Sequence, residues 1–418
     1  MTYLRKQIPI FRYGSILIII VAAISVFYFL HSPDNEIYID ADRHDQLVDS
    51  QQIYINNGYI KRPIAEFEPV DGLLLAWPPR RLQNKQGTEK KILRLYYRNF
   101  EKFLLTFISE VQRTQAANFL FEIAVSDDAE RRLLQKKLSN SPYPINTDTI
   151  KFLIIPLDTN WIRDFSPIFI QNRSLSDDRH NPGTAELVSA SDIQALSFHY
   201  GLNRADDGDF AEHYCDLKGI TSSTIPFKME KGNYMTDGRG TCFLGDNILT
   251  QNSHLDRTAI ESEFRAKLGC QKIIFLKSNT FDVTGGHIDF MVKIVKPDTI
   301  LVNRLTSEKP QGISKLFDQN ADLLISHGFR VIRIPSGVFK IKNRLFFPNY
   351  ANSLIVNGVV YMPVYSSGSK YMGMSKEHDQ LAQRIYESMA YKVVPIDSTV
   401  LIYFRGSIHC TTSEIPKL

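Results

Sequence analysis

Residues 258–276, TAIESEFRAKLGCQKIIFL, indicate most clearly which class of fold the chain adopts. Apolar side chains recur at helical spacing over Thr258–Leu268, and Gly269 is a residue at which a helix readily ends. The next apolar run, Lys272–Leu276, has the length of a buried strand. Because a helix that leads into a buried strand is typical of mixed α/β proteins, we expect a mixed α/β body from about residue 60 onward.

The same order of helix and strand returns elsewhere in the chain. The further pairs are helix Ala129–Leu138 with strand Ile150–Pro156, helix Ser314–His327 with strand Phe329–Ile334, and helix Glu377–Met389 with strand Val393–Ile396. Strand starts near residues 272, 331 and 393 lie 59 and 62 residues apart, and residue 150 lies 122 residues before 272. This spacing favours an internal repeat of about 60 residues, with coincidence in an ordinary mixed sheet as the alternative. One copy is missing near residue 212, where the polar stretch Asp206–Asp209 shows no helix followed by a strand.

Two β-hairpins are also marked in the sequence. They are Phe290–Val295 with Thr299–Val302, and Ser353–Val356 with Val359–Val364 around the turn Asn357-Gly358. These hairpins follow several of the predicted strands along the chain.

Length and composition exclude several classes of protein. The chain has 418 residues, of which 43% are hydrophobic and 22% charged, and 49 Lys+Arg stand against 45 Asp+Glu for a net charge of +4. These values exclude a disordered chain, a fibrous repeat and a strongly basic nucleic-acid-binding protein, so no nucleic-acid partner is expected. Length alone allows one large domain or up to about three. Four cysteines in a chain of this length are too few for a disulfide framework.

The N-terminal segment differs from the rest. Gly14–Leu30 is a run of 17 residues without a charge, just long enough to cross a membrane. Arg5, Lys6 and Arg12 precede it and acidic residues follow it, which predicts a cytoplasmic N-terminus at 1–13, a transmembrane anchor at 14–31 and an extracytoplasmic remainder, periplasmic or extracellular. We favour an uncleaved anchor over a cleaved signal peptide, because Phe27–His31 is bulky and no small-x-small pair follows the run. A buried core helix is a further alternative, but such a helix normally carries regularly spaced polar residues.

After this run we expect a polar linker over residues 32–60 and a single large body over 61–418. The sequence gives no signal for the oligomeric state. Of the four cysteines, Cys410 lies near the C-terminus, and the remaining three are Cys215, Cys242 and Cys270. These three cannot all pair with one another, and simple core packing is expected for them. A group with a metal-like composition is expected to form a solvated loop, because its spacing matches no zinc or EF-hand pattern; its members are His199, Asp206, Asp207, Asp209 and His213.

Chemistry is concentrated in four short islands. They are Asn160–Pro167, Glu230–Asn233 with the following Asp237–Thr241, Gly285–Asp289 and Gly406–Thr412. Any one of them alone has an ordinary structural explanation, such as an ion pair, a surface charge or a small buried thiol.

Together, however, the islands resemble one family. Glu66–Pro78, Trp161–Asp164, Glu230–Gly232, Gly286–Asp289 and Ile408–Cys410 are similar, in this order, to the motifs of the agmatine deiminase and bacterial peptidylarginine deiminase family of guanidine-modifying enzymes. The similarity spans residues 66–413. It implies an α/β propeller of five pseudo-symmetric modules around a central site, which would explain the suspected repeat.

The resemblance also implies a role for each site residue. Cys410 would be the nucleophile, His287 the general acid and then the base, and Glu230 the carboxylate that orients His287. Asp164 and Asp289 would bind the guanidinium, a planar cation that pairs well with carboxylates, beside the aromatic Trp161. We expect no metal and no cofactor.

The implied reaction converts agmatine to N-carbamoylputrescine and ammonia through a covalent cysteine amidino-thioether. Deimination of peptide or free arginine, amidino transfer to an amine and an inactive guanidinium-binding membrane protein are the alternatives. An extracytoplasmic position favours a peptide substrate, whereas no added recognition domain follows Cys410, which favours agmatine slightly.

The chain departs from the family pattern at several positions. Lys231 replaces a glycine, Gly285 replaces an acidic residue, Phe404–Ser407 replaces a glycine-rich approach to the nucleophile, and Ser197–Gly201 replaces an aromatic segment. These changes spare the catalytic residues and alter the walls of the pocket. They therefore bear on substrate identity more than on reaction class.

Overall fold

The computed structural model describes residues 55–56, 59–79, 86–174, 193–278, 286–306, 311–341, 344–365 and 372–417. The expected membrane anchor at Gly14–Leu30 and most of the expected linker lie outside these residues. Within the described ranges, none of the helices has both the length and the apolar character needed to cross a membrane.

Four continuous segments of the chain are built on one plan. In each, two strands pair antiparallel, a helical segment follows, and a third strand returns parallel to the second. The first two units are β6 (Ile168–Ser174), β7 (Ile193–Tyr200), α5 (Ala205–Lys218) and β8 (Ser222–Met229), then β9 (Tyr234–Thr236), β10 (Thr241–Gly245), α6 (Asn247–Gln251), α7 (Arg257–Leu268) and β11 (Lys272–Leu276). The next two are β12 (Val292–Lys296), β13 (Thr299–Leu305), α8 (Gln311–Ser326) and β14 (Arg330–Ser336), then β17 (Leu354–Val356), β18 (Val359–Val364), α9 (Lys376–Glu387) and β19 (Lys392–Asp397).

A fifth unit joins distant parts of the sequence. Its strands are β20 (Thr412–Pro416), which pairs antiparallel with β3 (Val70–Ala76), and β4 (Leu120–Val125), which is parallel to β3 and follows α2 (Gly87–Thr114). The sheet continues through α3 (Asp128–Ser139) to β5 (Ile150–Ile154), which is parallel to β4. The remaining strands are β1 (Ile55–Asn56) and β2 (Tyr59–Pro63), which extend the sheet beyond β6, and the hairpin β15 (Phe339–Ile341) with β16 (Arg344–Phe346).

Most of the predicted elements are confirmed. The helix over 258–268 is α7, it ends at Gly269 in the left-handed conformation with φ +76°, and β11 follows. Gly328 ends α8 in the same way with φ +89°. The two predicted hairpins are β12 with β13 and β17 with β18, and both Asn357 and Gly358 have the positive φ of a tight hairpin turn.

The missing copy of the repeat is present, so that part of the prediction is wrong. Helix α5 begins at Ala205, directly in the acidic stretch, and Asp206 and Asp207 lie in its first turn, where negative charge is favourable. Its buried side chains include Phe210 and Tyr214. The expected solvated loop is therefore a helix. Strand β5 at residue 150, which we counted as a repeat position, is instead an additional strand beside β4.

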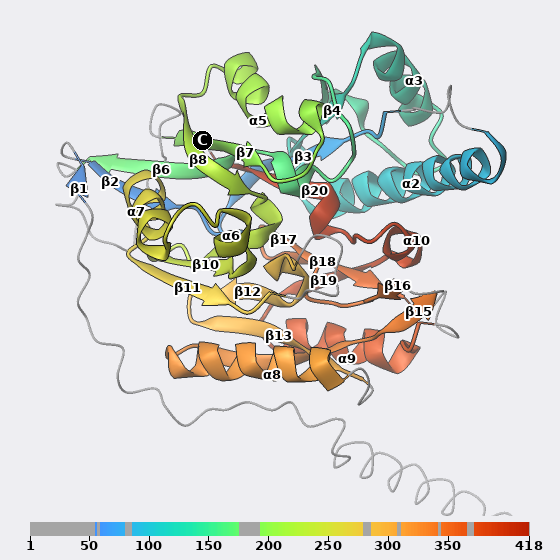
Figure 1. Ribbon diagram of the computed structural model, residues 1–418. Helices are drawn as coiled ribbons and strands as arrows, with labels where there is room; N and C mark the ends of the chain where they lie inside the picture. Colours follow the sequence, from blue (N-terminus) through green and yellow to red (C-terminus); the bar gives the residue numbers. More distant parts are fainter. Residues whose placement is uncertain are drawn as a thin grey trace, which may run out of the picture. The chain divides into compact units, whose positions relative to one another are not determined.

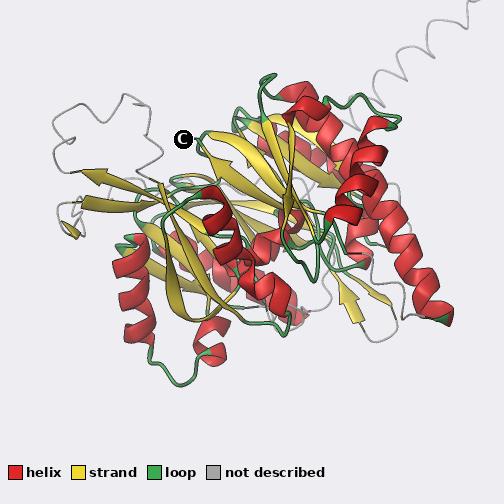
Figure 2. Cartoon of the chain, turned by 90° about the horizontal axis from the view of Figure 1, so that it is seen from above, coloured by secondary structure: helices red, strands yellow, loops and turns green. Residues whose placement is uncertain are grey.

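The helices pack on the strands through apolar faces. In α8, Ile313, Phe317 and Leu324 are buried and belong to one core cluster with Ile300 and Val302 of β13. Figure 1 shows α8 along β13 and α5 beside β7, and in Figure 2 the helices flank the strands. This packing leaves the ends of the strands and the turns between units to carry the functional groups.

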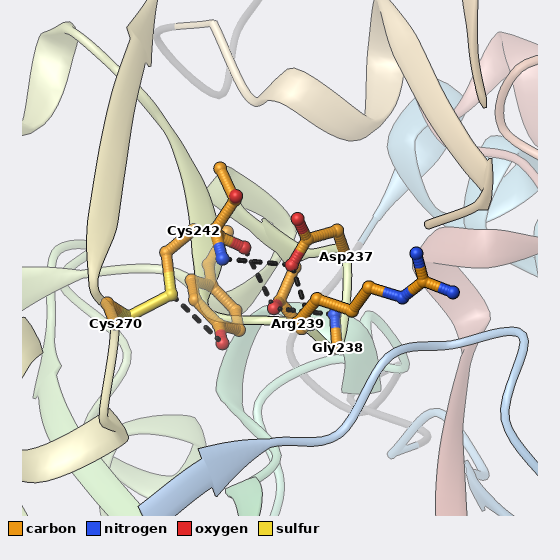
Figure 3. Close-up of a disulfide and its surroundings, with 8 residues drawn as sticks. Asp237, Gly238, Arg239, Cys242 and Cys270 are labelled. Atoms are coloured by element: carbon orange, nitrogen blue, oxygen red, sulfur yellow. Dashed lines mark hydrogen bonds between the residues drawn. A yellow bond between two sulfur atoms is a disulfide. The ribbon is translucent and has the colours of Figure 1, made fainter. Parts of the chain in front are cut away.

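A disulfide links Cys242 of β10 to Cys270, just after α7 (Figure 3). Both residues are fully buried, and Cys242 lies near the hydroxyl of Tyr234, with 4.0 Å between Sγ and Oη. The expectation of simple packing is therefore wrong for these two cysteines, because the fold brings together residues that are 28 positions apart. Cys215 is buried and free, as expected.

The folded part also begins earlier than the expected boundary at residue 60. Ile55 and Asn56 form β1, which pairs with β2, and β2 pairs with β6.

Candidate active site

The four chemical islands form short helical turns that meet at one place. The turns are α4 (Ile162–Phe165), η5 (Lys231–Asn233), η6 (Ile288–Phe290) and η8 (His409–Thr411). They precede the first strands of their units, β6, β9, β12 and β20. Turn α4 contacts both η5 and η8, and η5 contacts η6. The repeat of the fold therefore places functional residues from separate units side by side.

A cavity of about 380 Å³ opens at these turns. Five of the six predicted site residues line it: Trp161, Asp164, His287, Asp289 and Cys410. The sixth, Glu230, is buried and lies on the far side of the His287 ring from Asp164. The structure thus brings together all six residues that the sequence singled out.

His287 lies between two carboxylates. Its Nδ1 is 3.4 Å from Oδ1 of Asp164, and its Nε2 is 3.6 Å from Oε2 of Glu230. All three side chains are almost completely buried. Burial acts to lower the pKa of His287, but the two carboxylates outweigh it and raise the pKa well above its ordinary value. The imidazole is therefore protonated, the form that a general acid requires.

Cys410 lies in a different electrostatic environment. Its Sγ is 3.7 Å from Oδ2 of Asp289 and 3.5 Å from Oδ1 of Asn352. Burial and the carboxylates of Asp289 and Asp164 raise the pKa of the thiol well above its ordinary value. The sulfur is therefore a thiol, and a cation bound beside it would favour the thiolate.

Glycines allow the groups of the site to approach one another. A Cβ atom at Gly232 would lie 2.6 Å from Oδ1 of Asp164 and 2.7 Å from Nδ1 of His287. A Cβ atom at Gly406 would lie 2.1 Å from the ring of Trp161. Any side chain at these positions would displace the residues that line the cavity.

The comparisons with known proteins agree with this geometry. The model of the Porphyromonas-type peptidyl-arginine deiminase family matches residues 62–416. The chain belongs to this family. It is therefore an enzyme of the deiminase type, a hydrolase that acts on carbon–nitrogen bonds of amidines.

Individual members of the family cover most of the chain. The agmatine deiminase of Medicago truncatula is 26% identical over 306 residues, which are 65% of this chain and 79% of the relative. The solved structure of C. jejuni agmatine deiminase has a TM-score of 0.67 at 18% identity and covers 87% of this chain and 98% of its own. The agmatine deiminase of Enterococcus faecalis has a TM-score of 0.64 at 18% identity, with 86% and 96% covered. These structures show that the deiminase shares their mixed α/β fold.

The deiminase carries a buried lysine where the family pattern has a glycine. The ammonium of Lys231 donates to Oγ of Ser413 at 2.7 Å, to the carbonyl of Pro167 at 3.0 Å and to Oγ of Ser166 at 3.3 Å. These bonds tie the segment after α4 to β20. Burial and the nearby Arg163 lower the pKa of Lys231 to about 7. Lys231 therefore supports the floor of the site and does not line the cavity.

Arg163, which follows Ile162 in the first island, does not pair with Asp164. Its guanidinium binds the carboxylate of Glu414 through two contacts of 2.8 and 2.5 Å. The carboxylate of Asp164 therefore remains available to the cavity and to His287.

Sequence reasoning missed several residues of the site. Asn349 and Asn352 line the cavity and come from the segment before β17, the position in that unit that corresponds to the four islands. The repeat could have pointed to them, but asparagine alone carries no chemical signal. Three basic residues of the cavity wall were also missed: Arg204, Arg344 and Arg405.

Proposed function

We propose that the deiminase hydrolyses the guanidinium group of agmatine to a ureido group and releases ammonia. The observation that carries this proposal is the single cavity that holds Cys410, His287, Asp164 and Asp289. We choose agmatine because several relatives that cover most of the chain, among them those of Medicago truncatula, C. jejuni and Enterococcus faecalis, are agmatine deiminases.

In the first step, the carboxylates of Asp164 and Asp289 accept hydrogen bonds from the N–H groups of the guanidinium. The positive charge of the substrate offsets the carboxylates that raise the pKa of Cys410, so that binding itself favours the thiolate. The reactive thiolate thus forms when the substrate is bound, and the free enzyme keeps the less reactive thiol.

In the second step, the thiolate attacks the central guanidinium carbon and forms a carbon–sulfur bond. His287, held as an imidazolium by Asp164 and Glu230, donates its proton to the departing nitrogen, and the carbon–nitrogen bond breaks with loss of ammonia. The product of this half-reaction is an amidino-thioether on Cys410.

In the third step, the neutral His287 takes a proton from water, and the resulting hydroxide attacks the amidino carbon. The carbon–sulfur bond then breaks, its electron pair returns to the sulfur of Cys410, and the hydroxyl proton of the intermediate passes to that sulfur. The ureido product is released, the thiol is restored, and His287 is again an imidazolium. One histidine therefore acts as acid and then as base.

The test uses the full-length chain with agmatine. We expect ammonia and N-carbamoylputrescine from the wild type, none from Cys410→Ser, and unchanged turnover from Cys215→Ser, which removes a buried thiol outside the cavity. No ammonia from agmatine or from any arginine substrate would favour a guanidinium-binding protein instead. Appearance of the amidino group on an added amine would indicate amidino transfer.

One observation favours a second candidate substrate, arginine as a free amino acid or within a peptide. Arg204, Arg344 and Arg405 line the same cavity as the two carboxylates that face the guanidinium. Agmatine carries an ammonium at its far end, which these cations would repel, whereas a carboxylate at the far end of an arginine would be attracted.

The two substrates can be separated by their specificity constants. We propose to compare kcat/KM for agmatine, free arginine and a peptide with internal or C-terminal arginine, in the wild type and in Arg204→Gln. An arginine enzyme should lose kcat/KM for arginine in the variant, while an agmatine enzyme should keep or gain kcat/KM for agmatine. A tenfold preference of the wild type for an arginine substrate would replace agmatine in the account.

We further propose that the five units close into a five-bladed propeller around the cavity. The shared order of strands and helix supports this proposal, as do the pairing of β20 with β3 and the contacts among the turns α4, η5, η6 and η8. A crystal structure of the full chain tests the closure: five units in one ring around the cavity would support the proposal, and an open arrangement of the sheets would contradict it.

For the N-terminal segment we propose an anchor at residues 14–31 and a body outside the cytoplasm. The disulfide between Cys242 and Cys270 supports an oxidising compartment, because structural disulfides persist there and are rare in the cytosol of mesophiles. Protease added to spheroplasts, from which any outer membrane has been removed, should cut before residue 55 and release an active body. Protection of the body until the cytoplasmic membrane is lysed would overturn this orientation.

A further inference from the structure

A line of ionisable groups, buried except for the partly exposed Glu66, runs from Asp289 beside the nucleophile to Lys293. His409, which precedes Cys410 in η8, places Nδ1 2.8 Å from Oδ2 of Asp289 and Nε2 3.0 Å from Oε2 of Glu66. The ammonium of Lys293 contacts Oε1 of Glu66 and donates to the carbonyl of Ser353. None of these contacts was predicted, since Glu66 and His409 lie 343 positions apart.

The proton between His409 and Asp289 is assigned from the proposed function. The contact of Nδ1 with Asp289 joins an imidazole nitrogen to a carboxylate oxygen, and a hydrogen bond there requires one proton between the two atoms. Because Asp289 binds the guanidinium as a carboxylate, this proton is assigned to Nδ1, which then donates to Asp289. Burial and the cations Arg163 and Lys293 lower the pKa of His409 to about 3, so the neutral imidazole carries this proton alone.

The cluster does not suit a metal ion. Glu66, His409 and Glu414 bring their ligand atoms within 4.8 Å of one another. However, the ammonium of Lys293 already forms an ion pair with Glu66, and the guanidinium of Arg163 binds both carboxylate oxygens of Glu414. A divalent cation would have to displace both and would lie beside two fixed positive charges, which is unfavourable. The cluster is better described as a support for Asp289.

We propose that His409 is a positioning residue for deimination: its Nδ1–H bond to Asp289 holds that carboxylate against the substrate and takes up part of its negative charge beside Cys410. The inference rests on the proposed function, in which Asp289 binds the guanidinium. Oδ2 of Asp289 is the atom that both His409 and Cys410 contact, so a change at His409 reaches the sulfur through one atom. The other ionisable groups that face this pair are Asp164, Glu66, Lys293 and Arg163.

Two substitutions at His409 separate positioning from simple packing. In His409→Asn the side-chain amide nitrogen can occupy the place of Nδ1 and keep the bond to Asp289. In His409→Gln the amide nitrogen reaches the place of Nε2 and keeps only the bond to Glu66. Both variants lose the ring, so a purely structural role predicts similar losses for both.

The first readout is steady-state kinetics of the full-length chain. We expect His409→Asn to stay within about threefold of the wild type and His409→Gln to lose about 10- to 100-fold in kcat/KM, with a higher KM, because a hydrogen bond to a charged group is lost beside the substrate. His213→Gln, an exposed histidine on α5, is the matched control and should change nothing. Wild-type kinetics in His409→Gln, or equal losses in both variants, would overturn the proposal.

The second readout needs no turnover. The rate at which iodoacetamide alkylates Cys410 is followed against pH, with Cys410→Ser as the background, since Cys215 is buried and the other two cysteines are in the disulfide. The apparent pKa of alkylation should rise in His409→Gln and stay near the wild-type value in His409→Asn. An unchanged pKa in His409→Gln would contradict the role of His409. If the wild type turns over no guanidinium substrate, the proposed function fails, and the alkylation result still decides whether His409 acts through Asp289 on the sulfur.

Discussion

Loss of the disulfide between Cys242 and Cys270 is predicted to destabilise the folded deiminase by about 3.5 kcal/mol. The bond closes a loop that spans 28 positions and contains α6 and α7. For a loop of this length, the entropy removed from the unfolded chain corresponds to about 3.5 kcal/mol at 25 °C. Both sulfurs are fully buried, so the loss of their packing adds to this value.

The assay is urea unfolding of the full-length chain, followed by fluorescence, with Cys242→Ala and Cys270→Ala combined in one variant. Cys215→Ala serves as the matched control, because it removes one buried sulfur without opening a loop. We expect the double variant to lose about 3.5 kcal/mol beyond twice the loss of the control. A loss no greater than twice that of the control would refute the loop-closure reasoning, and it would also remove the support that the disulfide gives to an oxidising compartment.

Three further predictions concern the site and its support. Glu230→Gln should shift the alkaline limb of the pH profile of kcat/KM to lower pH with little change in KM. The reason is that Glu230 helps to raise the pKa of His287, so without this carboxylate the imidazolium loses its proton at a lower pH. An alkaline limb at the wild-type pH would contradict this role. Gly232→Ala should reduce kcat at least tenfold, since the new Cβ would collide with His287. Gly208→Ala on α5 is the control and should keep activity, because its new Cβ would lie 3.6 Å from Cβ of Tyr200, an ordinary contact. Equal activity of the two variants would contradict the prediction. The pKa of Lys231 in the folded state is lowered to about 7, so between that pH and about 10.5 the unfolded chain binds more protons than the folded one. The free energy of unfolding of the wild type should therefore rise with pH relative to that of Lys231→Met. Urea unfolding of both proteins at pH 7 and at pH 9 measures this, and the same difference at both pH values would contradict the prediction.

Local sequence signals were enough to locate most of the site. Three of the four islands combine a charged or nucleophilic residue with glycine, as with Gly232 beside Glu230, whereas Asn160–Pro167 contains no glycine. Each island forms a turn just before a strand. The ends of the helices were predictable for the same reason, since Gly269 and Gly328 adopt a conformation that other residues avoid.

Other features depend on contacts that a linear pattern does not reveal. The acidic residues at the start of α5 concealed its helical periodicity, because charges that favour the first turn of a helix also resemble a solvated loop. The pairing of Cys242 with Cys270 required the register of β10 beside β11. The contact of His409 with Glu66 required the fold to join the two ends of the chain, through the pairing of β20 with β3.

The mass of the full-length enzyme during turnover of agmatine reports whether Cys410 carries the covalent intermediate. Samples quenched in acid within the first turnovers are digested, and the peptide that contains Cys410 is identified. We expect this peptide to gain the mass of agmatine less one ammonia. In Cys410→Ser we expect neither the adduct nor the release of ammonia. Ammonia release by Cys410→Ser, or turnover by the wild type with an adduct on another residue, would contradict the account.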